Sequence, residues 1–236
     1  MDVKQLIAEG KGILGIEFGS TRIKAILTDD KGKILAEGSH TWENQLIDSC
    51  GKKIWSYSED AIWAGLQDCY SSLAADYKAK FGETLTKIDA IGISAMMHGY
   101  LPFDKECKLL VPFRTWRNTI TEEASDILTS KFGFNIPQRW SIAHLYQAIL
   151  DKEEHVSDIA FLTTLAGFIH WKLTGEKVLG VGDASGMFPI ADGNYDKAML
   201  DEFKSMTDID LNDILPKVLS AGEDAGRLTA EGAALL

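Results

Sequence analysis

Three short apolar runs near the start of the chain predict three strands. They cover Ile13–Phe18, Ile23–Thr28 and Lys33–Gly38, and each has a length that strands commonly have. The sequence DDKG between the second and third runs supplies a turn, because Gly32 can take the positive φ that tight turns require. We therefore expect the chain to begin with a meander of three strands.

After these strands, apolar residues recur every three or four positions instead of every two. This spacing over residues 58–81 predicts a helix, which Ser58 caps and which carries acidic residues in its first turn. A continuous apolar run at Ile88–Ser94 is short enough to be a strand buried on both faces. Two further strands, Tyr100–Phe103 and Leu109–Val111, are expected around a polar turn. The apolar helix positions are Ile62, Leu66, Cys69, Tyr70, Leu73 and Tyr77.

The second half of the sequence is expected to be mostly helical. Strands that come first, a helix that crosses to a buried strand, and further helices are typical of an α/β domain with a mixed sheet. We expect helices to begin at Thr121 and close at Gly133, to begin at Ser141, to run from Thr163–Thr164 to Gly175, and to cover 196–206.

Composition and charge exclude several classes of function. The chain has 236 residues, 45% of them hydrophobic, and a net charge of −11 without a basic stripe, so a nucleic-acid partner is not expected. No apolar run reaches membrane-spanning length, so no membrane partner is expected. The N-terminal sequence MDVKQLIAEGKG lacks the apolar core of a signal peptide. Three cysteines share no metal spacing and are expected to be buried thiols in a cytoplasmic protein.

Three kinds of site can be set aside, namely a dinucleotide loop, a P-loop and a metal site built from histidines. The sequence GVGDASG places Gly180, Gly182 and Gly186 one residue too far apart for a dinucleotide loop, and no helix-forming run follows it. A P-loop sequence is absent. The five histidines show no paired ligand spacing, so a metal site built from them is not expected.

The turn in ILGIEFGSTRIKAILTD carries an unusual set of polar groups. Gly19 allows a ligand to approach the backbone, Ser20 and Thr21 add hydroxyl groups, and Lys24 adds a positive charge. Because a carboxylate at Glu17 would repel bare phosphate, it fits a phosphate site only with a divalent cation and its waters between them. The turn alone leaves two interpretations open, a magnesium-phosphate cradle and an ordinary hairpin with polar turn residues.

Four stretches of the sequence resemble one protein family in the same order along the chain. GIEFGSTRIKAILTDDKGKILAEG is similar to the phosphate-binding hairpin of the FGGY carbohydrate kinases, which belong to the actin-like ATPase superfamily. IDAIGISAMMHGYLPFD resembles the second strand-turn unit, where xylulokinases carry Met-His-Gly. WKLTGEKVLGVGDASGMFPI and AGEDAGRLTAEGAALL resemble later segments, the last one a hairpin late in the first domain. The resemblance implies that residues 1–236 form the sugar- and phosphate-binding N-terminal domain, with the ribonuclease H-like α/β fold.

The resemblance also implies the residues of the site. Phosphate and magnesium contacts fall on Glu17, Gly19, Ser20, Thr21 and Lys24, with Glu17 holding the metal through water. The implied activity is ATP-dependent phosphorylation of a ketopentose or related polyol, with ATP and Mg²⁺ as cofactors.

Sugar contacts are implied at a second group of residues. Met97 and His98 follow the end of a strand, where ligand clefts of α/β sheets form, although core packing of Met97 and a surface role for His98 stay open as alternatives. The resemblance adds Trp116, Arg139 and, near the start of the Ser141 helix, His144.

The sequence departs from the family pattern in three places. Glu17 replaces the usual Asp, and the usual Trp-x-Asp-x-Arg becomes Trp116, Asn118 and Ile120. The family's catalytic Asp falls beyond Leu236, as does the C-terminal nucleotide-binding domain, so no catalytic base is assigned here. We therefore expect this chain alone to be inactive and to self-associate through its exposed interdomain face as a homodimer. A non-catalytic sugar-binding or regulatory module is the alternative function.

Overall fold

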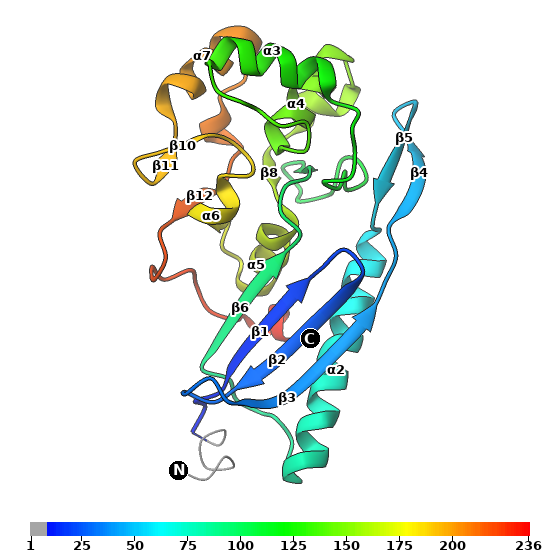
Figure 1. The fold of residues 1–236 in the computed structure, drawn as a ribbon, viewed down its shortest axis with the longest axis vertical. Helices are drawn as coiled ribbons and strands as arrows, with labels where there is room; N and C mark the ends of the chain where they lie inside the picture. Colours follow the sequence, from blue (N-terminus) through cyan, green and yellow to red (C-terminus); the bar gives the residue numbers. More distant parts are fainter. Residues whose placement is uncertain (1–8) are drawn as a thin grey trace. The chain divides into compact units, whose positions relative to one another are not determined.

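The computed structural model describes residues 9–236, which divide into two compact units (Figure 1). Unit 1 contains the chain up to Asn44 together with Ser58–Met96 and Ala230–Leu236. Unit 2 contains Gln45–Tyr57 and Met97–Thr229. The prediction that the chain has no signal peptide rests mostly on residues 1–8, which lie outside the described residues. No helix of the described part is long and apolar enough to cross a bilayer.

The sheet of unit 1 confirms the predicted meander and crossover. Its strand order is β3-β2-β1-β6, with β1 antiparallel to β2, β2 antiparallel to β3, and β6 parallel to β1 (Figure 1). The turn at Gly32 has the expected positive φ of 79°. The four strands are β1 (Ile13–Phe18), β2 (Arg22–Thr28), β3 (Ile34–Thr41) and β6 (Ala90–Ala95).

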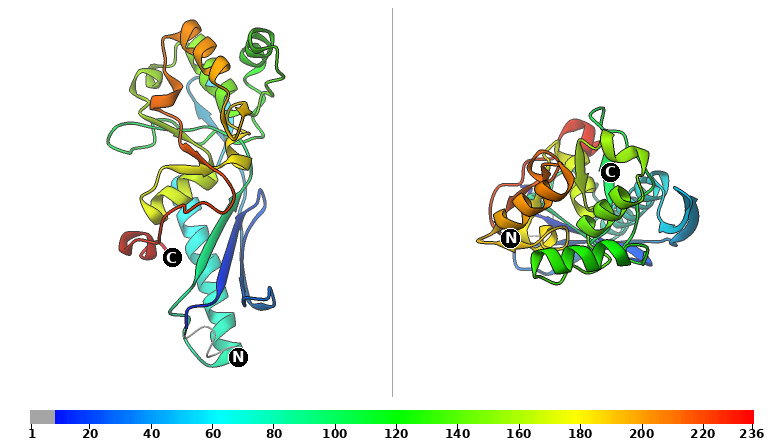
Figure 2. Two further views of the ribbon diagram at one scale, coloured as in Figure 1. Left: turned by 90° about the vertical axis from the view of Figure 1, so that its left-hand side faces the viewer. Right: turned by 90° about the horizontal axis from the view of Figure 1, so that it is seen from above.

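One long helix packs on β3 and β2 at one face of this sheet (Figure 2). Helix α2 (Glu59–Phe81) begins where the Ser58 hydroxyl accepts a hydrogen bond from the Ala61 N–H, and it closes at Gly82 with φ 74°. The helix packs very closely on β3, because a side chain at Gly38 would lie 2.6 Å from the Leu73 backbone nitrogen. Gly65 allows the same close approach from the helix side, where a Cβ would lie 2.6 Å from Ile23 Cδ1.

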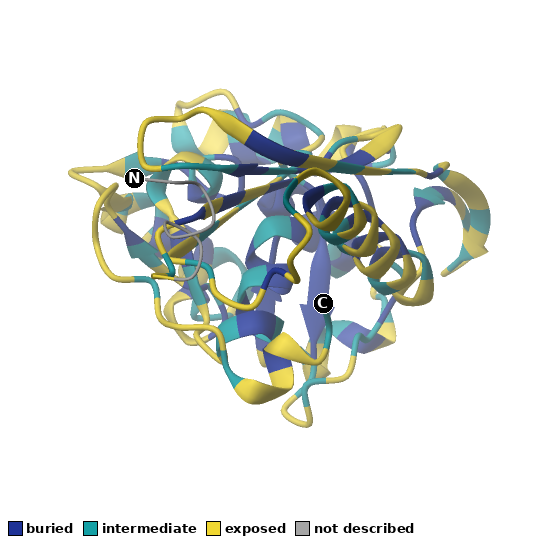
Figure 3. Ribbon diagram, turned by 90° about the horizontal axis from the view of Figure 1, so that it is seen from below, coloured by how far each residue is buried: buried dark blue, intermediate teal, exposed yellow. Residues whose placement is uncertain are grey.

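The other face of the sheet stays open. Buried and exposed residues alternate along β1 and β2 (Figure 3), so Leu14 and Ile16 lie on the buried face while Gly15 and Glu17 lie on the other. A side chain added at Gly15, or at its partner Gly92 on β6, would meet no atom within 4 Å. The expectation that Ile88–Ser94 is buried on both faces is wrong, because β6 is an edge strand whose residues are exposed or half-buried.

Unit 2 packs five helices and several short strand pairs around its own core. The pairs are β4-β5, β7-β8, β9-β12 and β10-β11. The helices are α3 (Glu122–Phe132), α4 (Ser141–Leu150), α5 (Leu165–Thr174), α6 (Val181–Ala184) and α7 (Lys197–Thr207). The strands are β4 (Gln45–Ser49), β5 (Lys52–Ser56), β7 (Leu101–Phe103), β8 (Phe161–Thr163), β9 (Val178–Gly180), β10 (Ile190–Ala191), β11 (Asn194–Tyr195) and β12 (Lys217–Leu219).

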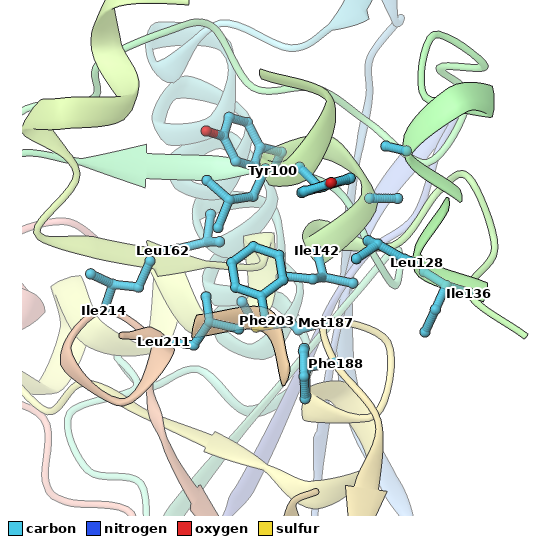
Figure 4. Packing of buried hydrophobic residues seen from close by; sticks show 14 of the residues in the cluster. Tyr100, Leu128, Ile136, Ile142, Leu162, Met187, Phe188, Phe203, Leu211 and Ile214 are labelled. Atoms are coloured by element: carbon cyan, nitrogen blue, oxygen red, sulfur yellow. The ribbon is translucent and has the colours of Figure 1, made fainter. Parts of the chain in front are cut away.

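Apolar side chains from α3, α4, α7 and several strands and loops of unit 2 meet in one cluster (Figure 4). Helix α4 lies deepest, with eight of its ten residues buried, as expected for a helix that is apolar on nearly every side. Phe203 of α7 and Leu162 of β8 are fully buried in the same cluster. The predicted helices from Thr121, Ser141 and Thr164 are confirmed, and each buries apolar side chains.

The structure corrects three further predictions. The β4-β5 hairpin was missed, although Cys50-Gly51 with φ values of 49° and 73° is the kind of turn that tight hairpins use. Cys50 lies in this turn and is exposed, so the prediction of three buried thiols is wrong.

The late hairpin expected within 221–236 is also absent from the structure. Asp224 instead turns the chain by accepting from the Gly226 N–H at 2.9 Å, and the short helix α8 (Ala230–Ala233) follows.

The close packing of α2 on β3 makes Gly38 sensitive to substitution. Gly38→Ala should lower the free energy of unfolding by about 1–3 kcal/mol, because the added methyl group forces backbone and side chains apart. Gly15→Ala, a strand glycine on the open face, is the matched control and should change stability by less than about 0.5 kcal/mol. Urea denaturation followed by circular dichroism measures both. Equal effects of the two substitutions would contradict the packing described here.

Candidate functional site

The polar turn between β1 and β2 places a carboxylate and an ammonium group side by side. Glu17 and Lys24 are directly opposite each other in the β1-β2 register, and Lys24 Nζ lies 3.3 Å from Glu17 Oε2. Both side chains are about half exposed. An exposed pair of this kind contributes only about 0.2–1 kcal/mol, so a ligand can separate the two charges at small cost.

Hydrogen bonds from Gly19 and Trp42 hold the backbone of this turn. The Gly19 N–H donates to the Arg22 carbonyl at 3.0 Å, and the Trp42 indole N–H donates to the Gly19 carbonyl at 2.7 Å. The Trp42 ring also packs edge-on against Phe18. Because a Cβ at position 19 would lie 3.0 Å from the Arg22 carbonyl, the turn has little room for a side chain there.

The remaining turn residues leave their polar groups exposed. Ser20 and Thr21 supply hydroxyl oxygens, and Arg22, which sequence reasoning did not assign to the site, adds an exposed cation at the start of β2. Carboxylate and hydroxyl oxygens suit Mg²⁺, which commonly keeps several waters and contacts only one or two protein carboxylates. The residues present therefore fit a magnesium-phosphate group, with Glu17 as the carboxylate that would face the metal's waters.

The second candidate surface is the turn Met97-His98-Gly99 at the start of the main segment of unit 2. His98 and Gly99 both have positive φ, 70° and 97°. A side chain at Gly99 would lie 2.7 Å from the Phe113 ring, so the glycine is required for both its conformation and its packing. Met97 is 43% exposed, which excludes the core-packing interpretation of this residue.

His98 is half-buried and is positioned by two other segments. Its Nδ1 lies 3.2 Å from the Gly186 carbonyl, and its ring stacks on Trp140 with centroids 6.4 Å apart. Burial lowers the pKa of His98, and the nearby Arg139 guanidinium lowers it further. The imidazole is therefore neutral at pH 7, with one nitrogen able to donate and the other to accept a hydrogen bond.

Gly186 is a part of this surface that sequence reasoning missed. A Cβ at position 186 would lie 2.6 Å from His98 Nδ1 and 3.2 Å from Met97 Cε. The glycine-rich sequence rejected as a dinucleotide loop thus makes room for the His98 ring. Only the unexplained run GVGDASG drew attention to it, because nothing in the sequence pairs residue 186 with residue 98.

The structure places the other predicted sugar contacts in different surroundings. Arg139 is exposed, and its carbonyl accepts from the Gly99 N–H at 3.2 Å, so it lies beside the Met97-His98-Gly99 turn. Trp116 is 42% exposed, but no hydrogen bond or ring contact within residues 9–236 joins it to His98. His144 is fully buried beside Tyr100, where burial lowers its pKa to about 3.

The segment that departs from the family pattern has a structural role. The Asn118 side chain is buried and hydrogen-bonds the backbone of Trp55 at both N–H and carbonyl. The Arg117 guanidinium stacks on the Trp55 ring, 3.6 Å from its centroid. Arg114 is fully buried and pairs with Glu153. The described partners of these residues all lie within the protein.

Two aspartates, Asp183 and Asp224, lie in the later segments that resemble the family. Asp183 is half-buried and accepts a hydrogen bond from the Thr164 hydroxyl at 2.6 Å. Burial raises its pKa, and the Thr164 hydrogen bond opposes the rise. Asp224 is exposed and closes the turn to Gly226. Both aspartates therefore hold local structure in the described chain.

Comparison with known proteins gives one family. Residues 12–236 match the model of the FGGY family of carbohydrate kinases, N-terminal domain. Xylulose kinase of Klebsiella pneumoniae is 23% identical over 232 residues, which are 92% of this chain and 44% of that protein. Glycerol kinase 2 of Clostridium tetani is 30% identical over 182 residues, 70% of this chain and 35% of that protein. The chain thus spans less than half the length of these relatives.

Solved structures give the same fold. A ligand-bound xylulose kinase from Lactobacillus acidophilus superposes with a TM-score of 0.75 at 21% identity, covering 95% of this chain and 45% of that one. A gluconate kinase from the same organism gives the same values. The predicted α/β fold with a mixed sheet, that of the actin-like ATPases, is thereby confirmed.

Proposed function

The chain belongs to the FGGY family of carbohydrate kinases, and from this membership we propose that it forms the sugar- and phosphate-binding part of an ATP-dependent sugar kinase. The observation that carries the proposal is the pair of surfaces described above, one charged and one built around a neutral histidine. The proposed reaction transfers the γ-phosphoryl group of ATP to a hydroxyl of a ketopentose or related polyol. Xylulose kinases among the relatives support this substrate class.

The β1-β2 turn is the proposed phosphate surface. Phosphoryl transfer depends on positioning and on neutralisation of charge that spreads over the phosphoryl oxygens. Lys24 supplies a cation, Ser20 and Thr21 supply hydroxyl donors, and Glu17 would hold Mg²⁺ through its waters. Bound Mg²⁺ would supply positive charge that neutralises the phosphate. Separation of the Glu17–Lys24 pair frees both charges for these tasks.

The Met97-His98-Gly99 turn is the proposed sugar surface. A neutral His98 both donates and accepts, which suits a sugar hydroxyl. Arg139 lies beside the same turn and offers a further donor, and Met97 offers exposed apolar surface to the carbon skeleton of the sugar. Trp116 completes the proposed set as an exposed aromatic side chain.

We assign the catalytic base and the adenosine site to sequence outside this chain. The relatives are about twice as long as the segment they share with it, and neither Asp183 nor Asp224 is free of a structural role.

A non-catalytic sugar-binding module is a second candidate function. It is favoured by the contact between Glu17 and Lys24, which balances both charges without a ligand.

The phosphate surface predicts a kinetic role for Lys24. In the longer kinase that contains this chain, Lys24→Ala should lower kcat by roughly 100-fold, the usual loss when one group that stabilises transition-state charge is removed. Lys33→Ala, at an exposed lysine beyond the far end of β2, is the control and should leave kcat unchanged. Steady-state kinetics with saturating sugar decides the point. Unchanged kinetics of Lys24→Ala would remove the hairpin from the phosphate site.

The sugar surface predicts a role for the space at Gly186. Gly186→Ala should displace the His98 ring and raise the KM for sugar about tenfold, which corresponds to the loss of about 1.4 kcal/mol. Gly182→Ala lies in the same glycine-rich run and meets no atom within 4 Å, so its KM should stay at the wild-type value. If both substitutions leave the sugar KM unaltered, His98 is not a sugar contact.

A further inference from the structure

Two segments of unit 2 bring a thiol, a carboxylate and an imidazole together. Cys50 lies in the turn between β4 and β5, while Glu153 and His155 lie in the stretch that follows α4. One ligand atom from each of the three lies within 4.8 Å of the others. None of the three belongs to the proposed phosphate or sugar surfaces, and their spacing along the sequence shows no metal motif.

Two of these groups have buried atoms without a hydrogen-bond partner. The side chains of Glu153 and His155 are only 5% and 7% exposed. Glu153 Oε2 pairs with Arg114 and lies 3.4 Å from His155 Nδ1, but neither Glu153 Oε1 nor His155 Nδ1 makes a hydrogen bond. A buried polar atom without a partner costs about 1–3 kcal/mol, and native proteins rarely leave one without a reason. Both atoms belong to groups that can donate an electron pair.

Neighbouring residues hold the His155 ring and the Glu153 carboxylate in place, as the hydrogen-bond partners of the ligands do in metal sites. Tyr100 Oη lies 2.8 Å from His155 Nε2, and a hydrogen bond at one ring nitrogen fixes the other as a ligand. Arg114 holds one oxygen of Glu153 and leaves the other free.

We propose that Cys50, Glu153 and His155 form a binding site for a zinc ion. Sulfur, nitrogen and oxygen donors together suit Zn²⁺, whereas Mg²⁺ and Ca²⁺ prefer oxygen donors alone. Zinc binding would form a Zn–S bond as the thiol proton of Cys50 leaves to water. The thiolate offsets one unit of the added charge beside Arg114. Cys50 is exposed, so the ion enters from solvent and a water completes its coordination.

The site would tie the β4-β5 turn to the end of α4. The same turn is already joined to that helix end by the ion pair between Lys52 and Asp151. A Zn²⁺ ion adds a second and stronger link between the same two segments. The ion therefore stabilises the folded state of unit 2, since a ligand that binds only the folded chain raises its stability.

Metal titration of the untagged, metal-free chain tests the proposal. We expect one Zn²⁺ per chain in competition with a chromogenic chelator, and a sulfur-to-cobalt absorption band when Co²⁺ replaces Zn²⁺. Cys50→Ala, a substitution of an exposed side chain, should weaken Zn²⁺ binding by more than the roughly 10- to 100-fold that loss of a second-shell partner costs. Cys107→Ala is the matched control, because Cys107 is also a free cysteine at positive φ and should leave the affinity unchanged.

Alkylation of the unaltered chain gives a second readout that needs no variant. Zn²⁺ should slow the reaction of iodoacetamide with Cys50 and leave the rate at Cys107 unchanged, as measured by peptide mass spectrometry. The proposal is overturned if Zn²⁺ does not bind, if Cys50→Ala binds it as tightly as the unaltered chain, or if Zn²⁺ protects both thiols equally.

Discussion

Close contact between the backbone of helix α2 and strand β3 is the constraint on which unit 1 depends. The contact is available only because residue 38 has no side chain, and Gly65 reduces the bulk of the helix surface that faces Ile23. The helix packs on β3 and β2 at one face of the sheet. Glu17 and Lys24 alternate with buried residues along β1 and β2 and are exposed on the opposite face.

In unit 2 the candidate sugar surface and the buried polar groups are formed by different residues. The Met97-His98-Gly99 turn keeps its shape through positive φ at two residues and through the small residue at position 186. Arg114 and Glu153 pair deep in the unit, and Tyr100 pairs with His155 beside them. Several buried atoms of Arg114 and Glu153 are left without a hydrogen bond.

Local patterns in the sequence were sufficient for most elements. The three-strand meander, the capped helix from Ser58 and the helices from Ser141 and Thr164 follow from periodicity and capping, which act over a few residues. Burial of β6 could not be predicted in the same way, since an apolar run reads alike in an edge strand and a central one. The β4-β5 hairpin was missed because its strands are short and only partly apolar.

The candidate site also contains some contacts that local sequence predicts and others that it does not. Glu17, Gly19 and Lys24 are close in sequence, so their grouping around one turn could be predicted. The contact of Gly186 with His98 joins residues 88 positions apart, and the meeting of Cys50 with Glu153 spans more than a hundred residues. No periodicity or spacing encodes such contacts.

The central claim is that this chain holds the acceptor surface and one wall of the phosphate site, while the base and the adenosine site lie elsewhere. The direct test is an ADP-release assay of residues 1–236 alone, with ATP, Mg²⁺ and a panel of pentoses, hexoses and polyols. Loss of a general base alone removes roughly 10²–10⁴ in rate, so the account predicts no sugar-dependent turnover above background. Turnover near about 1 s⁻¹, the low end of ordinary enzymes, would contradict it.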